Sequence, residues 1–144
     1  MRASLWLRIA AALAALYAAG HTAGRPWTPT HEDLAQGVVA AMRDVHFRAA
    51  GAVRSYWDFY QGFGLAISVL LAVEALALWQ LATLARAGAR YQTMAATHLV
   101  GFVLRGLVAA GYIFALPLGL ALAIATCLAL ALWRPQIPPP AALG

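Results

Sequence analysis

The chain has 144 residues, of which 63% are hydrophobic and only 10% are charged. About one quarter of the residues in a soluble domain are charged, so this composition excludes an ordinary water-soluble globule and indicates a protein that is solvated by a bilayer. The net charge is +5, and all ten basic residues are arginines spread over the segment ends, which favours a role in membrane topology over nucleic-acid binding.

The first predicted element is a hydrophobic segment over residues 5–24. Its uninterrupted apolar core, residues 9–20, is short, and small residues follow it, so a cleaved secretory signal peptide stays open as an alternative. If Arg8 extends its guanidinium to the interface, residues 5–22 form a helix about 27 Å long at a rise of about 1.5 Å per residue. That length spans a bilayer, and we therefore expect a retained first transmembrane helix.

The only long polar stretch follows, and we expect an amphipathic helix over residues 30–53 within it. Thr30 is a suitable N-cap, and acidic residues occupy the first turn. Apolar residues recur at helical spacing: Leu34, Val38, Met42 and Val45. This segment is too polar to span a membrane, so we expect it to lie on the membrane surface or to cap the helical bundle.

The second predicted span, residues 57–84, begins in an aromatic stretch, Arg-Ser-Tyr-Trp-Asp-Phe-Tyr-Gln-Gly-Phe-Gly, at residues 54–64. Aromatic rings with polar tips favour the membrane–water boundary, so this stretch indicates the mouth of a transmembrane helix. Arg54 and Asp58 are four residues apart, and on a helix they would lie on one face and neutralise each other. If the preceding helix continued past Gly51, His46 would share that face as well.

Two more spans are expected, at residues 91–114 and 116–133, and the run Leu-Pro-Leu-Gly at 116–119 would break the helix and permit a tight reversal where the second of them begins. The sequence therefore predicts an all-α integral membrane protein: a four-transmembrane-helix bundle with an amphipathic helix between the first and second spans. Residues 1–134 would form this single domain. Residues 135–144 contain several prolines, and we expect a disordered, extended tail.

Short-loop arginines set the expected orientation. Five of them fall on one side of the four spans and four on the other, where acidic residues offset them: Arg2, Arg8, Arg86, Arg90 and Arg134 against Arg25, Arg43, Arg48 and Arg54. We expect a multi-pass protein of the bacterial inner (plasma) membrane with both termini in the cytoplasm.

Polar residues inside the spans predict a buried site. If the second span ends and the third begins at the same membrane face, Glu74 lies about 15 Å deep, His98 about 10 Å and Arg105 about 21 Å. Antiparallel neighbours would bring Glu74 level with Gly101, between the other two. Intramembrane charges need a partner or a polar cavity. Together with two aromatic residues, the predicted ligand-binding residues here are Glu74, His98, Arg105, Tyr17 and Phe102.

A second predicted group lies near the outer face and would form a polar vestibule above an apolar cavity. Its residues are His21, His46, Arg54, Trp57, Asp58 and Tyr60. An ordinary interfacial aromatic belt is the alternative interpretation.

Several chemistries lack support in the sequence. His21 and His98 lie at different depths along their helices, which disfavours a bis-histidine haem. The chain has no Glu-x-x-His pair for a di-iron site and no histidine pair with zinc-ligand spacing, so we expect no metal and no cofactor, although three histidines from different segments could still converge in the fold. Ser55 and Ser68 have no adjacent base in the sequence, which gives little support to a serine nucleophile.

Three motifs carry a family resemblance: Gly-His-Thr-Ala-Gly at 20–24, Met-Arg-x-Val-His-Phe at 42–47, and the aromatic stretch at 54–64. The chain resembles a family of small bacterial membrane proteins with four predicted helices and no assigned function. Its layout is also similar to that of the emopamil-binding-protein superfamily, whose bundles hold sterol-like amines against membrane-buried acids. That similarity rests on His21, Glu74 and His98, and it implies a class of ligand without implying an activity.

The sequence thus leads to a membrane-embedded binding protein for a hydrophobic small molecule, in which Glu74 and His98 are the candidate catalytic residues if a proton shift occurs. The alternative is a structural or accessory subunit of a larger membrane complex, with Glu74 and Arg105 as a helix-locking ion pair. A proton or ion pathway through the same charges is a third hypothesis. The expected partners are membrane lipids, a hydrophobic small molecule, and further copies or subunits, but no nucleic acid.

Overall fold

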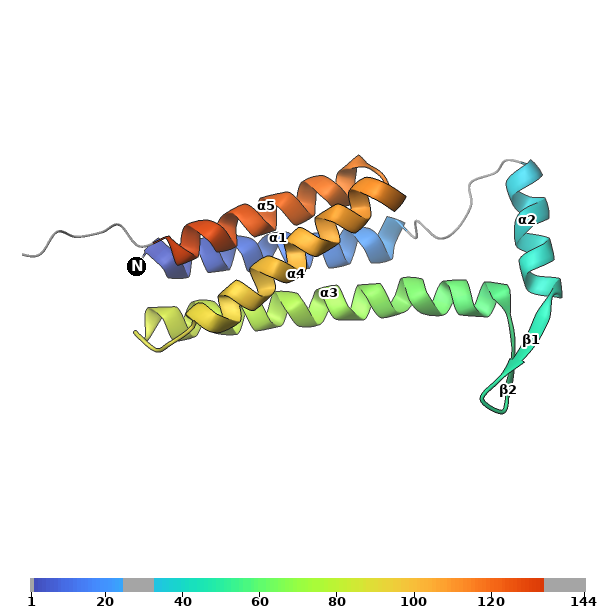
Figure 1. The fold of residues 1–144 in the computed structure, drawn as a ribbon, viewed down its shortest axis with the longest axis horizontal. Helices are drawn as coiled ribbons and strands as arrows, with labels where there is room; N and C mark the ends of the chain where they lie inside the picture. Colours follow the sequence, from blue (N-terminus) through green and yellow to red (C-terminus); the bar gives the residue numbers. More distant parts are fainter. Residues whose placement is uncertain (1, 25–32, 134–144) are drawn as a thin grey trace, which may run out of the picture. The chain divides into compact units, whose positions relative to one another are not determined.

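The computed structural model describes residues 2–24 and 33–133, which form five helices and one two-stranded antiparallel sheet (Figure 1). In chain order the elements are α1 (Arg2–Gly24), α2 (Asp33–Asp44), β1 (His46–Ala49), β2 (Ala52–Ser55), α3 (Tyr56–Arg86), α4 (Gln92–Tyr112) and α5 (Ala115–Leu132). The predicted helix cap at Thr30 and the predicted tail at 135–144 lie outside the described residues.

Four of these helices are long and apolar enough to cross a membrane: α1, α3, α4 and α5, with mean hydropathies of 1.5, 2.0, 1.5 and 2.3. They lie where the sequence predicted the four spans, which confirms the helical architecture. Large apolar side chains stay exposed along them, for example Val69 at 62% and Leu107 at 65%. Contiguous apolar surface of this kind is rare on soluble monomers and is expected where lipid covers the helices.

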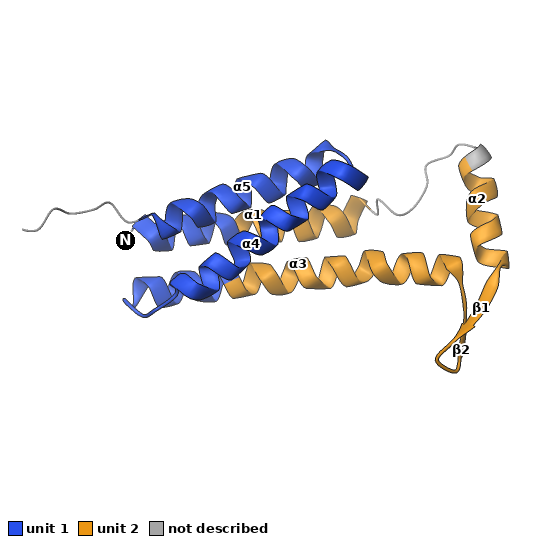
Figure 2. Ribbon diagram, in the orientation of Figure 1, with its two compact units in different colours: residues 1–11, 78–144 blue, residues 12–77 orange. Residues whose placement is uncertain are grey.

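The chain divides into two compact units, which we describe separately (Figure 2). The first unit comprises residues 1–11 and 78–144, and the second comprises residues 12–77.

In the first unit, α4 and α5 form a closely packed helical hairpin. Gly106 of α4 faces α5, since a Cβ added there would be in ordinary van der Waals contact with Leu118 and Leu122 at 3.8 Å. At the open end of the hairpin, the Tyr91 hydroxyl donates to the Ala131 carbonyl at 3.1 Å. The reversal between the helices falls at residues 113–114, slightly before the predicted one. Pro117 therefore lies in the first turn of α5, where its missing N–H costs no helical hydrogen bond.

The end of α3 is a Schellman motif, also in the first unit. Ala89 donates its N–H to the Leu84 carbonyl at 3.0 Å, and Gly88 donates to the Ala85 carbonyl at 3.4 Å. Gly88 has φ +74°, the left-handed conformation that this cap requires and that glycine adopts without strain.

In the second unit, the expected amphipathic helix over residues 30–53 is present but shorter. It ends at Asp44, and a β-hairpin occupies residues 46–55. Ala50 and Gly51 form the two-residue turn, with φ +50° and +80°. Positive φ at both positions is the type I′ geometry, whose twist matches paired strands. One helical face through His46, Arg54 and Asp58 was expected only if the helix continued past Gly51, and that condition is not met, because α2 ends at Asp44 and His46 begins β1.

A reciprocal capping box starts α3 directly after this hairpin. The Asp58 N–H donates to Ser55 Oγ at 3.1 Å, and the Ser55 N–H donates to Asp58 Oδ2 at 3.0 Å. Two backbone donors at the helix start are thereby satisfied. The Ser-Tyr-Trp-Asp run of the aromatic stretch is thus the point at which a strand becomes a helix.

Candidate functional site

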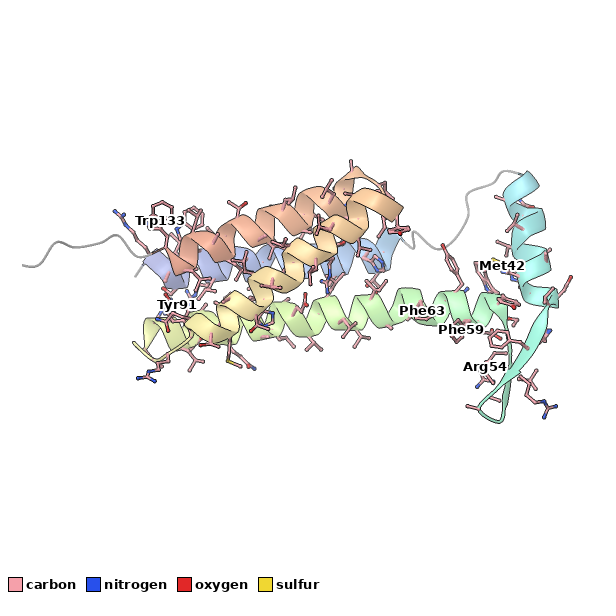
Figure 3. All side chains as sticks on the ribbon, viewed as in Figure 1. Met42, Arg54, Phe59, Phe63, Tyr91 and Trp133 are labelled. Atoms are coloured by element: carbon pink, nitrogen blue, oxygen red, sulfur yellow. The ribbon has the colours of Figure 1, made fainter. Side chains whose placement is uncertain are left out.

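A concavity of about 390 Å³ opens on the second unit at the start of α3. Its lining residues are Arg54, Asp58, Phe59, Gly62, Phe63 and Ala66. The helical ones recur at intervals of three and four residues, so they share one face of α3. Gly62 and Ala66 have almost no side chain, so the helix surface is hollow beside the two phenylalanines. Figure 3 shows Arg54, Phe59 and Phe63 following one another at this end of the helix.

The phenylalanines of the concavity are held by a run of aromatic contacts. The Phe59 and Phe63 ring centroids are 4.9 Å apart, nearly edge to face at 82°. Phe47 of β1 contacts Phe59 at 5.6 Å and Tyr56 at 5.0 Å. Edge-to-face pairs of this kind favour one ring orientation. The hairpin therefore orients the apolar wall, although Phe59 and Phe63 remain 51% and 59% exposed.

Opposite charges lie at the polar rim of the concavity, but they do not form the predicted helical pair. Arg54 belongs to β2 and donates through Nη1 to the Val53 carbonyl at 2.8 Å. Asp58 instead uses Oδ2 to accept the Ser55 N–H. The carboxylate also lies in the first turn of α3, where the helix dipole stabilises a negative charge. A guanidinium and a carboxylate thus face one small apolar surface.

Trp57 and Tyr60 belong to a separate cluster and do not line the concavity. Their rings are 5.9 Å apart, and the guanidinium of Arg43 from α2 lies 5.2 Å from the Trp57 ring centre. Trp57 is only 8% exposed. This cation–π contact links α2 to the start of α3, so Trp57 has a packing role that its place in the predicted vestibule did not suggest.

His21, another predicted vestibule residue, contacts Ser68, which the sequence gave little reason to regard as a nucleophile. Its Nδ1 lies 3.1 Å from Ser68 Oγ, which joins α1 to α3. Ser68 is 8% exposed, and its hydroxyl donates to the Gly64 carbonyl at 3.4 Å. The pair therefore joins two helices.

His46 is not brought into the concavity. Its ring Nδ1 lies 2.9 Å from the Asp44 carbonyl oxygen, at the exposed junction of α2 and β1.

The predicted buried site is divided between the two units. Tyr17 and Glu74 belong to the second unit, whereas His98, Phe102 and Arg105 belong to the first. Within the first unit, the Arg105 guanidinium lies 5.1 Å from the ring centre of Phe102, which is 1% exposed. The meeting of Glu74 with His98 and Arg105 stays a prediction.

Among residues 2–24 and 33–133, no group of three or more His, Cys, Asp or Glu side chains lies close enough to hold a metal ion. Comparison with protein-family models, with curated proteins and with solved structures gives no match to this chain.

Proposed function

We propose that the chain is a multi-pass membrane protein that binds a hydrophobic small molecule with a polar head at the start of α3. The observation that carries this proposal is the concavity, which places two phenylalanine rings beside a guanidinium and a carboxylate. Small-molecule sites commonly combine an apolar lining with a few convergent polar groups.

The length of α3 supports a position for this site at the membrane surface. Its 31 residues measure about 46 Å at a rise of about 1.5 Å per residue. The hydrocarbon core of a bilayer is only about 30 Å thick, so roughly ten residues of α3 extend beyond it. The mainly apolar run of α3 begins at Leu65, which puts the surplus at the start of the helix. Phe59 and Phe63 would then lie at the level of the lipid head groups, where a ligand enters from the bilayer.

The rim residues define the head group that would fit. Arg54 uses Nη1 on a neighbouring carbonyl, and its planar guanidinium has five N–H donors, so the others are available to an acceptor on the ligand. The apolar body would lie over Gly62 and Ala66.

Photo-crosslinking in lipid nanodiscs tests this function. The probe is a fatty acid with a diazirine in mid-chain, and mass spectrometry of peptides maps the labelled residues. We expect residues 59–66 to be labelled well above the other exposed faces of α3. Gly62→Leu should lower that labelling severalfold, because nothing lies within 4 Å of an added Cβ and the new side chain fills the concavity.

The matched control is Gly111→Leu, a substitution at another helical glycine with nothing within 4 Å of an added Cβ. It should leave the labelling of residues 59–66 unchanged. Labelling that is uniform along α3, or that survives Gly62→Leu, would contradict the proposal and favour the accessory-subunit hypothesis.

A further inference from the structure

The first unit carries only positive charge. All five acidic residues of the chain lie between residues 32 and 74, so residues 1–11 and 78–144 contain six arginines and no carboxylate side chain. Four of these arginines belong to the start of α1 or to the α3–α4 turn: Arg2, Arg8, Arg86 and Arg90. Figures 1 and 2 show that the start of α1, the end of α3, the start of α4 and the end of α5 lie at one end of this unit. We call this end the arginine end.

Arg8 is the best-defined group at the arginine end. Its guanidinium lies 5.1 Å from the ring centre of Trp79, and the residue is half-buried. Its Nε is buried, and among the described residues it has no hydrogen-bond partner. The positive charge of Arg8 is therefore stabilised by a cation–π contact with the indole ring of Trp79 instead of by a carboxylate. A guanidinium stacked on a ring keeps its in-plane N–H groups for an oxygen ligand.

Two further features order the chain at the arginine end. The Schellman motif at Gly88 turns the chain between Arg86 and Arg90, both of which are exposed. The Tyr91 hydroxyl ties the start of α4 to the carbonyl of Ala131. The backbone is thus ordered at the arginine end, and Arg86 and Arg90 are exposed there.

We infer that the arginine end binds the phosphate of an anionic phospholipid, with Arg8 and Trp79 as the central pair and Arg86 and Arg90 beside it. Charge complementarity is the main argument, since this unit supplies cations and no anion. Bidentate guanidinium binding matches the geometry of a phosphodiester. Exposed apolar side chains of the same unit, Leu5 at 57% and Leu84 at 39%, offer a surface for the acyl chains. This inference is independent of the ligand site in the second unit.

Native mass spectrometry of protein released from nanodiscs tests the inference. One nanodisc contains phosphatidylcholine alone, and the other contains phosphatidylcholine and phosphatidylglycerol in equal parts. From the mixed disc, the wild type should retain phosphatidylglycerol in preference to phosphatidylcholine. One arginine near an anionic surface contributes about fivefold to binding, so Arg8→Gln should reduce this preference by about that factor. Arg8→Lys keeps the charge but loses the planar stack, and it should give an intermediate result.

Arg48→Gln is the matched control, because it removes one exposed arginine from β1 in the other unit and should leave the preference intact. If Arg8→Gln fails to insert, the double variant Arg86→Gln and Arg90→Gln replaces it and should lower the preference as well. Equal retention of the two lipids by the wild type would overturn the inference. So would an Arg48→Gln effect as large as that of the arginine-end variants.

Discussion

Ser55 and Asp58 determine where the candidate site can form, because their reciprocal hydrogen bonds fix the first turn of α3. Phe59, Gly62 and Phe63 are presented on one face only if the helix begins at this register. The sequence predicted that residues 54–64 lie at the membrane boundary, but it also predicted that Asp58 would pair with Arg54 on one helical face. The two residues do not share a helical face, because β2 extends to Ser55, but their opposite charges still interact electrostatically.

Asp58→Ala should destabilise the start of α3. The variant leaves the Ser55 N–H without its acceptor and removes a negative charge from the positive end of the helix dipole, so the free energy of unfolding should fall. Denaturant titration in detergent micelles, followed by circular dichroism, measures the loss. The control is Asp44→Ala at the end of α2, where a negative charge has no favourable dipole and its removal should cost nothing. Equal losses in the two variants would contradict the capping role.

Ala50→Asn should stabilise the β-hairpin. Alanine at φ +50° is strained, whereas asparagine tolerates this conformation and Asn-Gly is the preferred type I′ pair, so the gain should be about 1 kcal/mol. Hydrogen exchange of the Phe47 and Arg54 amides reports on the pairing. Slower exchange is expected in the variant, and faster exchange would show that the turn is of another type.

At the scale of elements, the four long helices were predictable because hydropathy over about twenty residues is a property of composition and needs no tertiary contact. The β-hairpin was not predictable in the same way. Its turn is Ala-Gly instead of Asn-Gly, and the apolar spacing before it continues smoothly to Val45. Residues 46–55 form a hairpin instead of continuing the helix because Ala50 and Gly51 adopt a two-residue turn, which the apolar spacing does not reveal.

Replacing glycine by alanine should have opposite effects on stability at two positions, one in a helix cap and one in the middle of a helix. Gly88→Ala places a Cβ at φ +74° in the Schellman motif and should destabilise the α3–α4 turn by about 1 kcal/mol. Gly37→Ala lies within α2 with nothing within 4 Å of the new Cβ, so it should stabilise that helix by about 1 kcal/mol. Denaturant titration of both variants gives the signs. Effects of the same sign would contradict the assigned cap.

At the scale of the molecule, the two units differ in charge, because all the acidic residues lie in the second unit. Residues 12–77 contain all five acids and four arginines, whereas the first unit contains the other six arginines. The sequence showed an arginine bias, but the cation–π contact between Arg8 and Trp79 required the fold. The join between His21 and Ser68 likewise comes from residues 47 positions apart, with no local pattern to indicate it. Whether Glu74 meets His98 and Arg105 depends on helix rotation, which depth counting does not determine.

The central claim is that α3 crosses a bilayer with its concavity at the head-group level. Spin labels at single cysteines test it most directly, in a Cys127→Ser background and in lipid vesicles. The labelled positions are exposed ones along the helix: Tyr60, Val69, Val73, Leu76 and Leu84. Accessibility to oxygen relative to a water-soluble nickel complex should be highest near Val73 and should fall towards both Tyr60 and Leu84. Access of the nickel complex to Val69, Val73 and Leu76 as high as to Tyr60 would contradict the claim.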